Sequence, residues 1–151
     1  MATQQNKPAI RVRVATLGDA PRLAQLSGQL GYPSTPAQVT ERLAPILSDP
    51  EHVIYVAEKD SGEIPGWVDV SVMRAIAADP RAEIAGLVVD ESSRSQGTGR
   101  LLMSAAEEWA REKRCAAVSL RSNVIRERAH EFYERLGYQL IKTQKSYRKM
   151  L

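Results

Sequence analysis

Apolar and polar positions in the first third of the chain follow the spacing of one strand and two helices. Within residues 10–14, apolar residues alternate with arginines, which is typical of a half-buried strand. A helix with leucines at helical spacing is then expected between a cap at Asp19 and a stop at Gly31. The capping box that starts at Thr35 begins a second helix, and Pro45 is expected to kink its last turns.

The middle of the chain is rich in β-forming residues. Residues 52–58 and 66–72 are typical of two strands, and the turn-forming residues 60–62 between them predict a hairpin. The run 82–90 is almost continuously apolar, which predicts a strand buried on both faces.

A long amphipathic helix is expected next, over residues 97–114. Its apolar face is predicted to include Leu101 and Leu102, and basic residues in its last turn suit the helix dipole. A short strand at 116–121 follows.

The end of the chain predicts one more helix and one or two strands. The helix spans 129–136 and ends at Gly137, after which 138–143 begin a terminal strand or hairpin, with a further strand near Tyr147. Adjacent strands early in the chain favour antiparallel pairs, and the later strand-helix-strand order favours a parallel pair. The sequence therefore predicts an α/β (α+β) fold with a mixed sheet of six to seven strands and helices on both faces.

Length and composition fit one ordinary globular domain. The chain has 151 residues, of which 43% are hydrophobic and 26% charged. We expect a single domain over 1–151, with 1–9 as a loose terminus. The single cysteine, Cys115, excludes an internal disulfide, and no secretory leader or bilayer-spanning run is recognised. A cytoplasmic setting is the resulting expectation.

The net charge of +3 favours an anionic partner. Aromatic residues make up only 5% of the chain and charges alternate in sign along it, which argues against a nucleic-acid surface. His52 and His130 have no cysteine or acidic partner at metal-ligand spacing, so no metal site is expected.

The segment 88–102 is the part of the sequence most informative about chemistry. It joins a buried strand to a long helix through a short polar loop, and the free amides at a helix N-terminus form an anion site. Gly97 and Gly99 let the backbone approach a phosphate, and Arg94 and Arg100 add positive charge. The alternative is a glycine-rich loop that only starts a helix.

Two common nucleotide motifs do not match this loop. A dinucleotide fingerprint needs a small residue three places after Gly99, where Leu102 stands. A Walker loop needs a Gly-Lys pair, and the sequence has none. The pattern that remains is Arg-x-x-Gly-x-Gly, after a strand and before a helix.

In this pattern the chain resembles the GNAT superfamily of acyl-CoA-dependent N-acetyltransferases, whose central motif is Gln/Arg-x-x-Gly-x-Gly/Ala. Two further stretches are similar to the family. Ala82-Glu83-Ile84 looks like the start of its fourth strand, and residues 129–138 look like its Ala-x-x-x-Tyr-Glu-x-Leu-Gly-Phe/Tyr signature. The resemblance runs in order from about Ile10 to the C-terminus.

The resemblance implies acetyl-CoA as the acetyl donor, together with a set of residues that bind it. The loop amides would hold the pyrophosphate, and the strand before the loop would pair with the pantetheine arm through its backbone, while its side chains stay in the core. The implied coenzyme A-binding residues are Leu87, Val88, Val89, Arg94, Ser95, Gln96, Gly97, Thr98, Gly99, Arg100, Asn123 and Arg126.

Asn123 departs from the family pattern. The family asparagine usually lies three positions before the alanine of the last signature, here Ala129, and Arg126 occupies that place. Asn123 either reaches the pantetheine arm or caps the following helix. For Arg121, Arg126 and Arg128, the alternatives are a contact with the ribose phosphate of coenzyme A and a solvated helix face.

The resemblance also implies two catalytic residues. Glu83 lies where the histone-acetylating branch of the family has its general base, and an amine of pKa about 10.4 gains from losing a proton before it attacks. Tyr133 matches the family tyrosine that protonates the departing thiolate. The alternatives are a solvated strand-end carboxylate for Glu83 and a core aromatic for Tyr133, whose ring can pack while its hydroxyl reaches the cleft. Asp69 is a weaker candidate for holding a cationic amine.

The leading hypothesis is an acetyl-CoA-dependent N-acetyltransferase in which a primary amine attacks the thioester directly. A strand amide near Leu87 or Val88 would polarise the carbonyl, and no covalent intermediate is expected on Cys115. The alternatives are an acyl-CoA-binding sensor or interaction module without turnover, and a nucleic-acid-binding protein. The acceptor, a small molecule or a protein amine, would be gripped near 31–34 and 144–147. A homodimer is common among such folds, whereas neither nucleic acid nor a membrane is an expected partner.

Overall fold

The computed structural model describes residues 9–151. It divides into two compact units, one ending at Arg121 and the other running from Ser122 to Leu151. The expected loose terminus, residues 1–9, lies outside the described residues except for Ala9. The expectation of a single domain stays a prediction.

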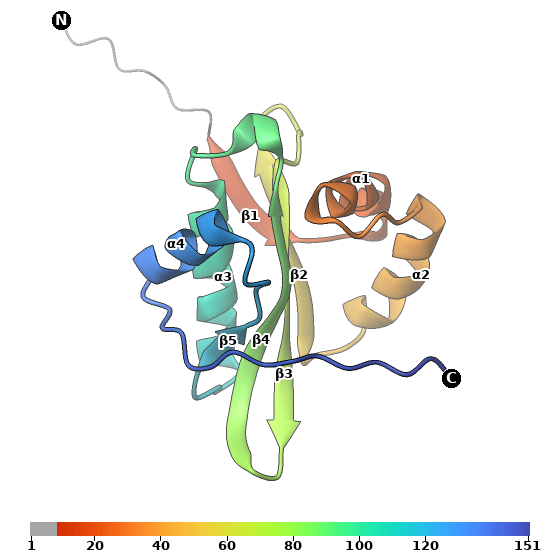
Figure 1. Cartoon of the computed structure of the whole chain (residues 1–151). Helices are drawn as coiled ribbons and strands as arrows, with labels where there is room; N and C mark the ends of the chain where they lie inside the picture. Colours follow the sequence, from red (N-terminus) through yellow and green to blue (C-terminus); the bar gives the residue numbers. More distant parts are fainter. Residues whose placement is uncertain (1–8) are drawn as a thin grey trace, which may run out of the picture. The chain divides into compact units, whose positions relative to one another are not determined.

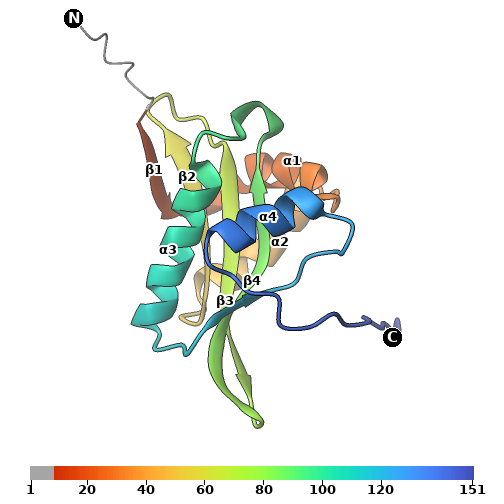
Figure 2. The same cartoon turned by 60° about the vertical axis from the view of Figure 1, so that its left-hand side comes forward.

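The strands of the first unit form one mixed sheet. Their bounds are Ile10–Val14 (β1), His52–Lys59 (β2), Gly66–Ala75 (β3), Ala78–Val89 (β4) and Val118–Leu120 (β5). The strands lie in the order of their numbers, with antiparallel pairing from β1 to β4 and parallel pairing of β5 with β4. The β3–β4 hairpin projects beyond the other strands (Figures 1 and 2). The predicted mixed sheet is confirmed, but within residues 9–151 it has five strands instead of six to seven.

Helices cover both faces of this sheet, as predicted. Their bounds in the first unit are Leu17–Asp19 (η1, a 3-10 turn), Ala20–Leu30 (α1), Pro36–Leu47 (α2), Glu91–Ser93 (η2, a 3-10 turn) and Thr98–Glu112 (α3). Figure 1 shows α3 on one face and α1 with α2 on the other. Gly31 ends α1 with φ 96°, and the Gln38 amide donates to the Thr35 hydroxyl at 3.1 Å, as the capping box predicts. Pro45 lies inside α2 near its end.

The buried face of α3 includes Leu102, as predicted, but not Leu101. Leu102, Met103 and Ala106 are at most 1% exposed, whereas Leu101 is 42% exposed. Positions 98, 102 and 106 repeat at the helical period, and Thr98 at the start of this row is also buried. Counting the apolar face from Leu101 therefore assigned that leucine to the wrong side of the helix.

β4 carries a β-bulge that the apolar run did not predict. Asp69 pairs with Gly86 and Val70 with Ile84, so Ala85 is an extra residue in β4. The expectation of burial on both faces is also wrong at this place, because Ala85 is exposed and Gly86 only half-buried. The bulge changes the alternation of the strand and puts Ala85 on the face that α1 and α2 cover.

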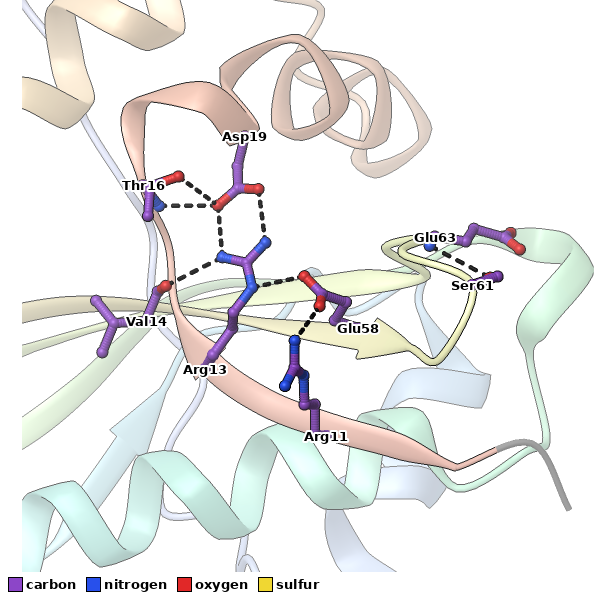
Figure 3. A network of polar contacts seen from close by, with 8 residues as sticks. All are labelled: Arg11, Arg13, Val14, Thr16, Asp19, Glu58, Ser61 and Glu63. Carbon is purple, nitrogen blue, oxygen red and sulfur yellow. Dashed lines mark hydrogen bonds and ion pairs between the residues drawn. The ribbon is translucent and has the colours of Figure 1, made fainter.

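A network of charged side chains joins β1, η1 and β2 (Figure 3). The Arg13 guanidinium donates two hydrogen bonds to Asp19, at 2.8 and 2.9 Å, and one to Glu58, at 2.6 Å. Asp19 also accepts from the Thr16 amide at 2.8 Å, and these contacts hold the pKa of Asp19 below its usual value. Asp19 is the N-cap residue of α1, but its carboxylate orders the turn before the helix instead of capping it through a side-chain bond.

The second unit has one helix, α4 (Glu127–Arg135), as its regular element. Gly137 follows with φ 92°, as expected for the end of a helix. The predicted strand at 138–143 and the further strand near Tyr147 are wrong, because no strand is present there. Leu140 and Ile141 are neighbours and are 82% and 79% exposed. Two adjacent apolar residues break the period-2 alternation that a half-buried strand requires.

Candidate functional site

The loop between β4 and α3 has an unusual backbone. Ser95 has φ 67° and Gly97 has φ 83°, and α3 starts at Thr98 directly afterwards. A non-glycine residue with positive φ is uncommon, and such strain gathers at ligand clamps and active sites. The amides of the first residues of α3 have no partner within the helix, so they are available to an anion.

Side chains around this loop fit an anionic ligand. Arg94 and Arg100 are exposed, and neither forms a hydrogen bond or ion pair with the part of the chain that the structure describes. Thr98 is 1% exposed, and its hydroxyl has no partner among the described residues. A buried polar atom without a partner calls for an explanation, and a ligand bound at the start of α3 would supply one.

The base of the loop is tied to α1. Arg22 donates to the Asp90 carboxylate at 2.5 Å and to the Ile64 carbonyl at 2.9 Å. The Glu91 amide donates to the Gln29 side chain at 3.1 Å. The hydrogen bond from Arg22, the largest cause, lowers the pKa of Asp90 to about 2. The Asp90 carboxylate of this α1–loop clamp, formed by Arg22, Asp90 and Gln29, is therefore ionised at neutral pH.

The last part of β4 has an open edge beside β5. β5 pairs with Ala82, Glu83 and Ile84 only, so within the described chain the residues Leu87–Val89 have no strand partner on that side. A strand edge with free backbone groups can bind an extended, amide-containing ligand by β-augmentation. This is the stretch expected to pair with the pantetheine arm.

A cavity of about 310 Å³ lies between α1, α2 and the sheet. Its walls are mostly apolar, with Leu30, Val39, Ile46 and Trp67 among the lining residues, and Ala85 of the bulge also lines it. Its polar lining residues are Ser27, Tyr32, Ser34, Arg42 and Asp69. The cavity belongs entirely to the first unit.

Asp69 in this cavity is paired with a histidine that the sequence analysis did not assign. The His52 Nε2 atom lies 2.6 Å from Asp69 Oδ1, and the hydrogen bond to Asp69 raises the pKa of His52 while burial opposes the rise. In the strand register His52 lies opposite Ser71, and Asp69 lies opposite Ile54, so the two side chains are diagonal neighbours on one face. The sequence predicted the β2–β3 hairpin but not its register, and the register is what brings His52 and Asp69 together.

Glu83, the predicted general base, has arginine partners. Its carboxylate accepts a hydrogen bond from Arg121 at 2.8 Å and lies 3.8 Å from Arg81. Glu83 pairs with Ser71 in the register, which puts it on the same sheet face as Asp69. It does not line the cavity. The carboxylate placed in the cavity is that of Asp69.

The remaining predicted site residues belong to the second unit. Tyr133 is half-buried, and its ring makes edge contacts with Phe132 and Tyr138 at centroid distances of 5.2 and 6.0 Å. Burial raises the pKa of Tyr133, so the phenol keeps its proton at neutral pH. Arg126 is the N-cap residue of α4, while the Asn123 side chain accepts from the Ile125 amide at 3.2 Å. Asn123 therefore closes a turn before α4 and does not cap the helix.

The described residues offer neither a metal-ligand cluster nor a membrane-spanning helix. Within residues 9–151 no group of three or more histidine, cysteine or acidic side chains could hold a metal ion. No described helix combines the length and apolar character needed to cross a bilayer.

Comparison with known proteins decides the family. The sequence model of the acetyltransferase (GNAT) family matches residues 21–138, which include the cavity, the β4–α3 loop and α4. The chain belongs to the GNAT family. The chain is 27% identical over 132 residues to an aminoglycoside N(6')-acetyltransferase type 1 of Stenotrophomonas maltophilia, covering 85% of each chain.

Solved structures agree with this family assignment. A putative acetyltransferase from Agrobacterium tumefaciens superimposes with a TM-score of 0.81 at 28% identity, over 92% of this chain and 99% of that one. An aminoglycoside N-acetyltransferase solved with CoA has a TM-score of 0.85 at 19% identity, over 99% and 100% of the two chains, which shows a shared fold. As a GNAT protein, the chain is an acetyl-CoA-dependent N-acetyltransferase. Acetyl-CoA fits the orphan Thr98 hydroxyl, the free α3 amides and the two unpaired arginines.

Proposed function

We propose that the chain transfers the acetyl group of acetyl-CoA to a primary amine by direct attack. The observation that supports this proposal is the layout of β4. Ala85 lines the cavity, Leu87–Val89 follow with a free edge, and the strand then leads into the loop before α3. Along the chain, a wall of the cavity is followed by a strand edge for an extended arm, and then by the loop that would hold a pyrophosphate.

In this proposal the loop and the strand edge bind the donor. The amides from Ser95 to Arg100 hold the pyrophosphate, with Arg94 and Arg100 adding charge. The backbone of Leu87–Val89 pairs with the pantetheine arm, and a backbone amide near Leu87 or Val88 polarises the thioester carbonyl. Asn123 and Arg126 are further donor contacts carried over from the family resemblance.

In the reaction, a carbon–nitrogen bond replaces the carbon–sulfur bond of the thioester. The amine nitrogen forms a bond to the carbonyl carbon, the carbon–sulfur bond breaks, and the thiolate leaves with the electron pair. The proton lost by the amine goes to a carboxylate, for which Glu83 is the family-implied candidate, directly or through water. Tyr133 gives the thiolate a proton, so that the free thiol of coenzyme A leaves.

Cys115 is not expected to carry the acetyl group. Burial raises the pKa of its thiol, and a protonated thiol is a weak nucleophile. The cysteine follows the C-terminal end of α3, which at 15 residues is roughly 22 Å long, while the anion loop precedes the other end. A Cys115→Ala variant should keep its turnover, and loss of turnover would contradict direct attack.

Release of free thiol from acetyl-CoA in the presence of a panel of primary amines tests the function. The panel includes an aminoglycoside because of the relatives' names. Turnover is expected with at least one amine, and Tyr133→Phe and Glu83→Gln should each lower kcat by about a hundredfold. Tyr55→Phe, which removes another phenol whose pKa burial raises, and Glu108→Gln on exposed α3 surface are the controls.

Two outcomes would contradict this account. Normal turnover in the Tyr133 or Glu83 variant would remove the role assigned to that residue. Thermal stabilisation by coenzyme A without thiol release for any amine would favour the alternative, an acyl-CoA-binding sensor without turnover.

A further inference from the structure

The cavity between α1, α2 and the sheet is apolar over most of its wall. Leu30 of α1, Val39 and Ile46 of α2 and Trp67 of β3 surround it. Its volume of about 310 Å³ is at the small end of the range of ligand pockets, about 300–1,000 Å³. Such a space suits a compact apolar group better than an extended polar chain.

The Trp67 wall depends on the absence of a side chain in β4. A Cβ on Gly86 would lie 3.0 Å from two atoms of the Trp67 ring. Glycine at this position therefore lets the indole lie against the strand beside the β-bulge. The result is a flat aromatic wall next to Ala85, where an apolar or aromatic body can stack.

A single carboxylate lies in this apolar space. Of the described lining residues only Asp69 is acidic, and its side chain is 22% exposed. The contact of 2.6 Å with His52 holds the Asp69 carboxylate in place. His52 contacts only the Oδ1 atom, so the Oδ2 atom of this single carboxylate can accept a hydrogen bond from one ammonium group on an apolar body.

The lining of the cavity also carries a positive charge. Arg42 lines the cavity and donates to the Ser34 hydroxyl at 3.0 Å, next to Tyr32, which is 70% exposed. A guanidinium in the lining repels an acceptor with several ammonium groups. The charges of the lining therefore oppose polycations such as aminoglycosides and polyamines.

We propose that the acceptor is a primary amine on a single compact apolar or aromatic group, with its ammonium on Asp69 and its body against Trp67, Leu30 and Val39. This inference rests on the acetyl transfer proposed above, since it names the acceptor of that reaction. It makes Asp69 the amine-binding residue. The ammonium gives one proton to Glu83, the base named above, directly or through water, and the neutral nitrogen then reaches the β4 edge over Ala85, where the bulge faces the cavity.

The experiment compares a monoamine that has an aromatic body with a monoamine that lacks one and with two amines that carry several ammonium groups. Thiol release from acetyl-CoA is measured with 2-phenylethylamine, ethylamine, kanamycin and spermidine. We expect kcat/KM for 2-phenylethylamine to exceed that for each of the others by about tenfold or more, because it alone has a ring that packs against the apolar wall. Binding of each amine in the presence of coenzyme A is measured in parallel by calorimetry.

Variants then locate the amine. Asp69→Asn should lower kcat/KM for 2-phenylethylamine by about tenfold to a hundredfold and leave the KM for acetyl-CoA unchanged. Val39→Phe, which fills the cavity, should lower kcat/KM for 2-phenylethylamine more than kcat/KM for ethylamine. Asp60→Asn removes an exposed carboxylate in the β2–β3 turn and is the matched control.

The outcomes separate this inference from the proposed function. Asp69-dependent binding of 2-phenylethylamine without thiol release would support the acceptor class and contradict acetyl transfer. Turnover in which kanamycin or spermidine is preferred, or in which Asp69→Asn has no effect, would overturn the acceptor class and leave acetyl transfer standing. If 2-phenylethylamine neither binds nor turns over, the acceptor class is overturned. Thiol release with the other amines then decides whether the proposed function stands.

Discussion

The imidazole of His52 and the carboxylate of Asp69 meet on the cavity side of the sheet, 2.6 Å apart. The hydrogen bond to Asp69 raises the pKa of His52 above its usual value of about 6.5. The folded state therefore favours the charged imidazolium. The pair stabilises the fold fully below the unfolded-state pKa, and this contribution is lost as the pH rises through the folded-state pKa.

A titration of stability follows from this pair. The free energy of unfolding is measured by urea denaturation between pH 5.5 and pH 9 for the native chain and for His52→Gln. We expect the variant to be less stable by roughly 1–2 kcal/mol near pH 6, since a hydrogen bond between charged groups is lost. The difference should shrink as the pH rises, because the native chain loses the same contribution.

His130→Gln is the control for this titration. The His130 ring contacts the Asn123 carbonyl at 2.9 Å, so no carboxylate contact is removed. A stability difference for His52→Gln that stays constant or grows with pH would show that the His52–Asp69 pair does not act as described.

Among single residues, the sequence points more directly to the β4–α3 loop than to the cavity. Gly97 and Arg94 stand in a contiguous motif, which is readable without a structure. His52 and Asp69 are 17 positions apart, and their contact depends on the register of the β2–β3 hairpin. Glu83 was singled out by its position in the family motif, while its ion pair with Arg121 comes from the parallel pairing of β4 with β5.

Among the elements, α1 and the β4–α3 loop are joined by the α1–loop clamp. Arg22 lies in the first turn of α1 and reaches Asp90, the residue after β4, with the Ile64 carbonyl as a second acceptor. The clamp fixes where the loop starts, although Arg22 itself has no place in the proposed donor site. We therefore regard Arg22 as a positioning residue for the loop.

Steady-state kinetics of Arg22 variants test this positioning. Arg22→Met removes the hydrogen bonds to Asp90 and Ile64, together with one to Gln25. We expect the KM for acetyl-CoA to rise by about tenfold while kcat changes by less than about threefold. Arg22→Lys keeps the charge beside Asp90 and should recover part of the loss.

Arg111→Met is the control for the clamp, because it removes only an exposed ion pair with Glu108 on α3. An unchanged KM for acetyl-CoA in Arg22→Met would show that the clamp does not position the loop. A fall in kcat alone would lead to the same conclusion.

The order and type of the elements followed from hydrophobic periodicity, and the exceptions have local causes. The bulge at Ala85 adds one residue to β4, which no apolar count reveals. Leu101 belongs to an apolar pair, and only the start of α3 at Thr98 decides which leucine is buried. The strand expected at 138–143 rested on apolar content without alternation.

In the whole molecule, the first unit contains the donor loop, the open edge of β4 and the cavity, while the second contains Tyr133, Asn123 and Arg126. Part of the net charge of +3 has a place in the proposed donor site. Arg94 and Arg100 are exposed cations at a helix N-terminus, as the site of a polyanionic donor requires. Composition alone indicated an anionic partner, and the loop motif was needed to distinguish coenzyme A from nucleic acid.

Direct transfer of the acetyl group from acetyl-CoA to the amine leaves no acetyl group on the protein at any stage. Mass spectrometry of both protein and amine tests this, after incubation with 2-phenylethylamine and acetyl-CoA that carries an isotopically labelled acetyl group. We expect the label on the amine nitrogen and none on the protein at any time point. Label on the Cys115 side chain would contradict direct transfer, whereas 2-phenylethylamine that stays unlabelled while the thioester persists would contradict only the proposed acceptor class.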